Sequence, residues 1–79
     1  MTLDQARRIQ RELVPHSGCI VNGDPFLTYG TWVLPFSHEG KSLSVLLSNR
    51  AIVSEADHEK VANEAAAKLF EARSRPDTV

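Results

Sequence analysis

The chain has 79 residues, 42% of them hydrophobic, and a formal net charge of −1. This length allows one domain with a thin core, and the near-neutral charge provides no global field to attract nucleic acid or an anionic membrane. The single cysteine, Cys19, excludes an internal disulfide, and no apolar run is long enough to span a membrane, so we expect a cytoplasmic protein without a signal peptide.

A first helix is predicted over residues 3–14. Thr2 followed by Gln5 is the pattern of a capping box, in which each residue satisfies a backbone amide of the other. Apolar residues then recur every three or four positions, which places them on one helical face: Leu3, Ala6, Ile9 and Leu13. Pro15 has no amide hydrogen to continue the helical ladder, so we expect the helix to end before it.

Two strands joined by a short loop are predicted in the middle of the chain. Residues 27–36 are rich in aromatic and β-branched side chains, and residues 42–48 alternate apolar side chains with serine except at Leu46. The polar segment 37–41 contains a glycine, which suits a hairpin loop of about three to five residues. Residues 19–21 and 51–53 are shorter strand candidates beside turn-rich stretches.

The most clearly patterned element is an amphipathic helix over residues 54–73. Ser54 can cap this helix, and Glu55 and Asp57 lie where the helix dipole favours negative charge. Its apolar stripe consists of Val61, Ala62, Ala65, Leu69 and Phe70. Residues 74–79 have no apolar anchor before the final valine, so we expect a flexible tail after a single domain of residues 1–73.

The order of these elements predicts a single α+β domain, with two helices packed on one face of a two- to three-stranded antiparallel sheet. If alternating residues such as Trp32 and Val45 face the helices, then Tyr29, Val33 and Leu46 lie on the opposite face. An exposed apolar patch of this kind favours a partner. The alternative is that these three side chains are scattered, or are covered by residues 16–27.

No motif in the sequence predicts catalysis or a bound metal. Four residues offer zinc-binding atoms: His16, Cys19, His38 and His58. Only the first two are close in sequence, and a thiol nucleophile would need a cleft for which this length leaves little room. Gly40-Lys41-Ser42 copies the end of a phosphate-binding loop, but Pro35 stands where that loop needs its first glycine. We therefore expect no enzyme activity, no metal, no cofactor and no small-molecule substrate.

A basic strip on the first helix is an alternative contact surface. It consists of Arg7, Arg8 and Arg11 on that helix, together with Lys41 from the predicted hairpin loop. The element order resembles that of the double-stranded-RNA-binding domain, a family that often places a histidine, here His38, in the loop between its first two strands. That family holds phosphates with a lysine-rich start to its last helix, whereas residues 54–59 of this chain contain three acids.

The sequence therefore favours a small protein–protein interaction module. Such a module self-associates as a homodimer, or binds and modulates a larger protein as an adaptor, a subunit or an inhibitor of the kind that mobile genetic elements encode. The alternative function is weak nucleic-acid binding through the basic strip. Nucleic acid is the less favoured partner because the acids at the start of the last helix repel phosphate, and no membrane partner is expected.

Overall fold

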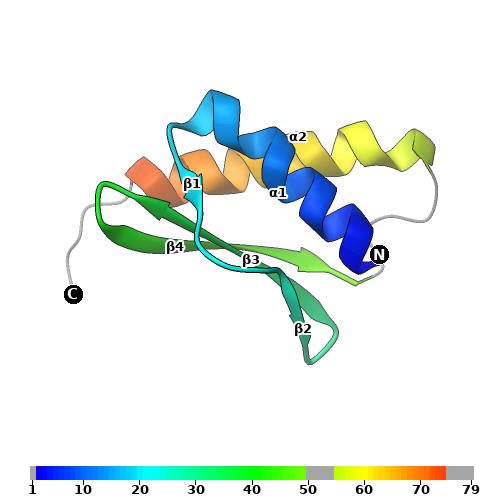
Figure 1. Cartoon of the computed structure of the whole chain (residues 1–79). Coiled ribbons are helices and arrows are strands. Elements are labelled where there is room, and N and C mark those ends of the chain that lie inside the picture. Colours follow the sequence, from blue (N-terminus) through cyan, green and yellow to red (C-terminus); the bar gives the residue numbers. More distant parts are fainter. Residues whose placement is uncertain (1, 50–54, 75–79) are drawn as a thin grey trace.

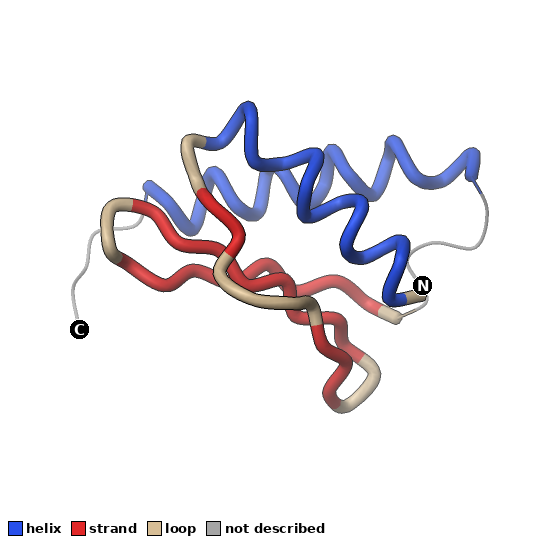
Figure 2. Tube along the Cα trace, viewed as in Figure 1, coloured by secondary structure: helices blue, strands red, loops and turns tan. Residues whose placement is uncertain are grey.

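The computed structural model describes residues 2–49 and 55–74, which form helices and strands in the order α-β-β-β-β-α (Figure 1). The elements are α1 Leu3–Ser17, β1 Ile20–Val21, β2 Phe26–Thr28, β3 Thr31–His38, β4 Lys41–Ser48 and α2 Glu55–Ser74. Both helices lie on one face of an antiparallel sheet, as the separate helix and strand layers of Figure 2 show. The predicted α+β class is confirmed, with four strands in place of the two or three predicted.

Some of the predicted elements lie outside the described residues. These are the brief strand at 51–53, the capping residue Ser54 and most of the tail at 74–79. Ser74 itself belongs to α2, so the boundary predicted after residue 73 lies one residue too early. Within residues 2–49 and 55–74, no helix is both long and apolar enough to cross a membrane.

Helix α1 begins as predicted but ends later than predicted. The Thr2 hydroxyl accepts a hydrogen bond from the Gln5 amide at 3.2 Å, and the Gln5 side chain accepts one from the Thr2 amide at 2.9 Å. Pro15 does not end the helix, because a proline in the last turn removes only one ladder bond. The helix instead ends at Gly18, whose left-handed φ of 71° forms the C-cap.

The strand predicted at 27–36 is wrong, because a tight turn divides it into β2 and β3. Tyr29 and Gly30 form this turn with φ angles of 48° and 74°, the left-handed pair typical of a two-residue hairpin loop. The β3–β4 loop is also shorter than the predicted three to five residues. Glu39 and Gly40, with φ angles of 51° and 80°, connect those strands directly.

Strand β3 is the centre of the sheet. Strand β4 pairs with β3 along its whole length, so β1 and β2 follow each other along the other edge, opposite residues 36–37 and 31–33. Residues 22–25 interrupt that edge strand as a bulge, and the Asn22 amide still donates to the Pro35 carbonyl at 3.2 Å.

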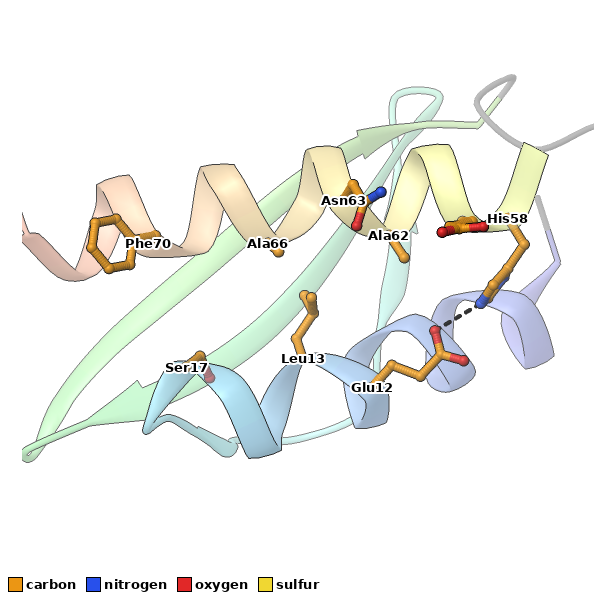
Figure 3. Close-up of a pocket in the computed structure, with 9 residues that line it drawn as sticks. Glu12, Leu13, Ser17, His58, Ala62, Asn63, Ala66 and Phe70 are labelled. Atoms are coloured by element: carbon orange, nitrogen blue, oxygen red, sulfur yellow. Dashed lines mark hydrogen bonds and ion pairs between the residues drawn. The ribbon is translucent and has the colours of Figure 1, made fainter. Parts of the chain in front are cut away.

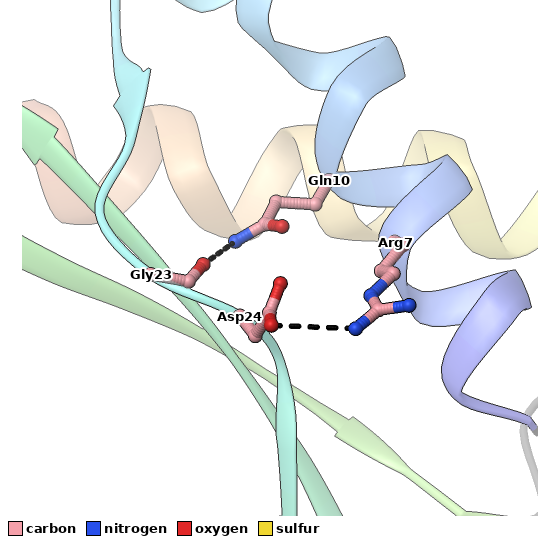
Figure 4. Close-up of polar contacts among 4 residues, drawn as sticks. All are labelled: Arg7, Gln10, Gly23 and Asp24. Atoms are coloured by element: carbon pink, nitrogen blue, oxygen red, sulfur yellow. Dashed lines mark hydrogen bonds and ion pairs between the residues drawn. The ribbon is translucent and has the colours of Figure 1, made fainter.

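Helix α1 holds this bulge in place through two polar contacts (Figure 4). Gln10 is only 3% exposed, and its side-chain amide donates to the Gly23 carbonyl at 3.0 Å and to the Pro35 carbonyl at 2.9 Å. Arg7 forms an ion pair with Asp24 at 3.3 Å on the surface. Because Gln10 satisfies two backbone carbonyls at once, it is the main tie between α1 and the broken edge of the sheet.

The core lies between the sheet and the two helices. Its buried members are Ala6, Ile9, Leu13, Cys19, Trp32, Leu34, Phe36, Val45, Leu47, Val61, Ala65 and Leu69. The predicted stripe of the last helix is correct at Val61, Ala65 and Leu69 but wrong at Phe70, whose side chain is 59% exposed. Phe70 follows Leu69 directly, so it lies about 100° further round the helix and away from the core.

Candidate functional site

The sheet face that points away from the helices carries an exposed apolar row. Phe26 on β2, Val33 on β3 and Leu46 on β4 are register partners, so their side chains lie side by side across the sheet. Phe26 and Leu46 are each 52% exposed, and Val33 between them is half-buried. We call the sheet face that carries this row the open face.

The open face carries no charged side chain at any position that the strand register assigns to it. Those positions are Ile20, Phe26, Thr28, Thr31, Val33, Pro35, Ser37, Ser42, Ser44, Leu46 and Ser48. Across the whole chain 24% of residues are charged, so this face is depleted of charge. Exposed apolar residues surrounded by serine and threonine without charge are the composition of an interface centre.

Both edges of the sheet are protected, in contrast to its open face. The Asn49 amide donates to the Gly30 carbonyl at 2.9 Å, and by alternation the Leu46 carbonyl points away from β3, toward the free edge of β4. The Lys68 ammonium donates to that carbonyl at 2.9 Å. On the opposite edge, the bulge at residues 22–25 interrupts the strand, so neither edge offers a long template for strand addition.

Tyr29 occupies a position that no packing within the described chain explains. The sequence predicted Tyr29 within a strand, but the residue lies in the β2–β3 turn, and its side chain is fully exposed. A tyrosine in the left-handed region is less favourable than asparagine or glycine. The unfavourable backbone conformation therefore presents a large aromatic ring to solvent at the tip of the β2–β3 hairpin.

Sequence reasoning identified Val33 and Leu46 on this face but missed Phe26 and Ile20. Phe26 was missed because the strand was predicted to begin at residue 27 and to continue through Tyr29. The positive φ angles at Tyr29 and Gly30 shorten the connection to two residues and bring Phe26 opposite Val33. The signal in the sequence was Tyr29-Gly30 between two alternating segments, since glycine favours such turns.

The predicted basic strip is partly neutralised. Arg7 pairs with Asp24 at 3.3 Å, and Arg8 pairs with Glu12 at 3.4 Å. Arg11 is exposed on α1, whereas Lys41 begins β4 at the opposite end of the sheet from the start of α1 (Figure 1). The four cations therefore do not form one continuous surface of free charge.

The observed strands change the comparison with the double-stranded-RNA-binding domain. If β1 and β2 count as one interrupted strand, the order is helix, three strands, helix. The loop between the first two strands is then Tyr29–Gly30, whereas His38 ends β3 at the second hairpin. The position of His38 therefore departs from the pattern that the resemblance implied.

Two of the residues considered as metal or thiol sites take part in packing within the chain. Cys19 is buried in the core beside α1, and the ring Nε2 of buried His58 lies within hydrogen-bond distance of the Glu12 carboxylate, at 2.7 Å. Among the described residues, no group of three or more histidine, cysteine or acidic side chains is arranged to hold a metal ion.

A groove lies between α1 and α2, on the other side of the molecule from the open face (Figure 3). Its volume is about 460 Å³, and it is lined by Glu12, Leu13, Ser17, His58, Glu59, Ala62, Asn63, Ala66 and Phe70. The contact between buried His58 and Glu12 closes one end of this groove, and Phe70 stands at the other end. Sequence reasoning missed the groove, because Ala62 and Phe70 were assigned to the stripe that faces the sheet.

A scan of protein-family models matches none of them to this chain, and searches of curated proteins and of solved structures likewise find no match.

Proposed function

We propose that this chain is a protein–protein interaction module that self-associates through the open face of its sheet. One observation carries the proposal: an exposed row of Phe26, Val33 and Leu46 lies on a sheet face without charged side chains. An antiparallel sheet that faces water normally alternates apolar residues on the core side with polar or charged residues on the other. An uncharged, partly apolar face is instead suited to packing against protein.

A second copy of the chain is the partner that this face fits best. Because the face has no charge, two copies meet without like-charge repulsion, and the many serines are small enough for the sheets to approach. Two sheets pack face to face at a separation of about 10 Å, with side chains of both faces interdigitating. A chain of 79 residues has a thin core of its own, so a shared second core layer would stabilise it considerably.

Face-to-face packing is favoured over two other modes of association. Edge-to-edge strand pairing is disfavoured because Lys68 occupies the Leu46 carbonyl on β4 and the bulge interrupts the other edge. Nucleic-acid binding is disfavoured because the open face supplies no cation and because Arg7 and Arg8 are paired with acids.

Sedimentation equilibrium tests this proposal through oligomeric mass. We expect the unmodified chain to approach twice its mass of 8.7 kDa as concentration rises. Leu46→Glu should weaken association by about thirtyfold or more, because the dimer would bury a carboxylate within the apolar row.

Leu27→Glu is the matched control for this experiment. Leu27 is 49% exposed, close to the 52% of Leu46, but it pairs with Trp32 and so belongs to the other sheet face. Association should be unchanged in this variant. A monomer at every concentration, or equal loss of association in both variants, would contradict the proposal, and capture of a different protein by the open face would replace the second copy as the partner.

A further inference from the structure

The groove is lined by residues of α1 and α2. Both helices lie on the sheet face opposite the open face (Figure 1), so the groove is independent of the proposed dimer. We infer that this groove docks an amphipathic helix from a partner protein, with an apolar stripe along the groove and a basic residue at the end where Glu59 lies. The lining of the groove, its length and its charges favour this occupant.

Apolar side chains run along the floor of the groove. Ala62, Ala66 and Phe70 follow one another at intervals of four residues and so form one stripe along α2, and Leu13 of α1 faces them (Figure 3). Phe70 is among the most exposed large apolar side chains of the described chain. Small alanines beside an exposed aromatic ring leave room for another helix to approach closely and give it an anchor.

The shape of the groove favours a helix over a compact small molecule. From His58 to Phe70 the groove follows α2 for about 18 Å, at a rise of about 1.5 Å per residue. A volume of about 460 Å³ spread over that length is a shallow trough. Such a trough fits three or four side chains that a helix presents at positions i, i+4, i+7 and i+11.

The two ends of the groove differ in charge, which orients the occupant. Glu12 and Glu59 lie at the end nearest the start of α2, and because Arg8 and His58 already contact Glu12, Glu59 is the carboxylate that an occupant meets there. At the other end, the Arg73 guanidinium donates to the Ser17 carbonyl at 2.6 Å and lies 4.7 Å from the centre of the Phe70 ring. A helix with acids in its first turn and lysines in its last turn, antiparallel to α2, complements both ends and its own dipole.

Titration of the isotopically labelled full chain with synthetic helical peptides tests this inference by NMR. The first probe is a 14-residue alanine-based peptide with leucines at i, i+4, i+7 and i+11, two glutamates in its first turn and two lysines in its last turn. The second probe replaces both lysines with glutamate. We expect the lysine peptide to bind saturably with a Kd below about 1 mM, and the glutamate peptide to bind about tenfold more weakly.

Two neighbouring alanines provide matched variants of the protein. Ala66 lines the groove, whereas Ala67 is exposed on α2 outside it. Ala66→Arg should weaken binding of the lysine peptide by about tenfold, Ala67→Arg should leave it unchanged, and Glu59→Gln should reduce the preference for lysine. Arginine keeps a high helix propensity, so both variants should fold equally well.

The inference is overturned if the lysine peptide produces no saturable shifts, if the shifts map to the open face, or if Ala66→Arg and Ala67→Arg bind it equally. Equal affinity of the two peptides would remove the acidic end from the recognition. Binding of a small apolar dye at the groove residues in the absence of peptide binding would show that the groove takes a small molecule, which also contradicts the inference.

Discussion

The two faces of the sheet are built from alternating residues of the same strands, yet one face is buried under the helices and the other is exposed to solvent. Leu34 and Phe36 of β3 point under the helices and are fully buried, whereas Val33 and Pro35, which alternate with them, point to the open face. The strand positions of the open face carry no charge, and those of the inner face carry one only at Lys41, beside the β3–β4 turn. Burial within the chain explains the composition of the inner face. Helix α2 borders the open face at its β4 edge, beside Ser44 and Leu46, yet Phe26 and Leu46 remain half exposed, so the composition indicates a surface that a partner covers.

Adjacent leucines on β4 give the largest expected difference between the two faces. Leu47 is fully buried, so Leu47→Ala should lower the free energy of unfolding by about 2–5 kcal/mol. Leu46 lies on the open face, so Leu46→Ala should cost the monomer less than about 1 kcal/mol, the size of a cross-strand contact. Urea denaturation of both variants at low protein concentration measures this difference. Equal losses would mean that the chain itself covers the open face.

The broken edge of the sheet depends on one buried amide, which provides the next largest effect. Gln10→Leu keeps about the same side-chain volume but removes the Gln10 donor from the carbonyls of Gly23 and Pro35, and the Pro35 carbonyl keeps the Asn22 amide. We expect a loss of about 1–3 kcal/mol, since an unsatisfied buried acceptor costs about that much.

Arg7→Ala is the control on the same helix, because it removes only the exposed ion pair with Asp24. That loss should stay below about 1 kcal/mol. Hydrogen exchange of the Asn22 amide should accelerate in Gln10→Leu and remain slow in Arg7→Ala. A Gln10→Leu variant as stable as the unmodified chain would show that α1 does not hold the bulge.

The smallest expected effect concerns Tyr29. Replacing this residue should change monomer stability and dimer affinity in opposite directions. Tyr29→Asn places a residue that tolerates the φ of 48° in the turn, so the monomer should become more stable by about 0.5 kcal/mol. The same change removes an exposed ring beside the open face, so dimer formation should weaken. Thermal unfolding at low concentration and sedimentation equilibrium measure the two effects. Tighter association in this variant would exclude Tyr29 from the interface.

Much of the fold could be predicted from local patterns. The capping box at Thr2, the alternation through Trp32 and Leu34, and the spacing of Val61 and Ala65 each encode one element and one buried face. Local patterns do not report tertiary contacts. No local pattern singles out Gln10, whose burial follows only from the bulge beneath α1.

The candidate site was predicted less completely, because it depends on register. Val33 and Leu46 follow from alternation within one strand, whereas Phe26 joins them only through the two-residue turn. The groove between α1 and α2 depends on how α2 is rotated about its axis. Neighbouring residues of a helix differ by about 100° of rotation, so Leu69 is buried whereas Phe70 faces solvent.

The most direct test of the central claim is an isotope-filtered NMR experiment on a mixture of labelled and unlabelled chains, which detects contacts between copies only. The account predicts intermolecular contacts from the methyl groups of Val33 and Leu46 and from the Phe26 ring, and none from the buried methyl groups of Val45 and Leu47. A dimer whose intermolecular contacts come only from Phe70 and the helix layer, or a chain that shows none at millimolar concentration, would contradict it.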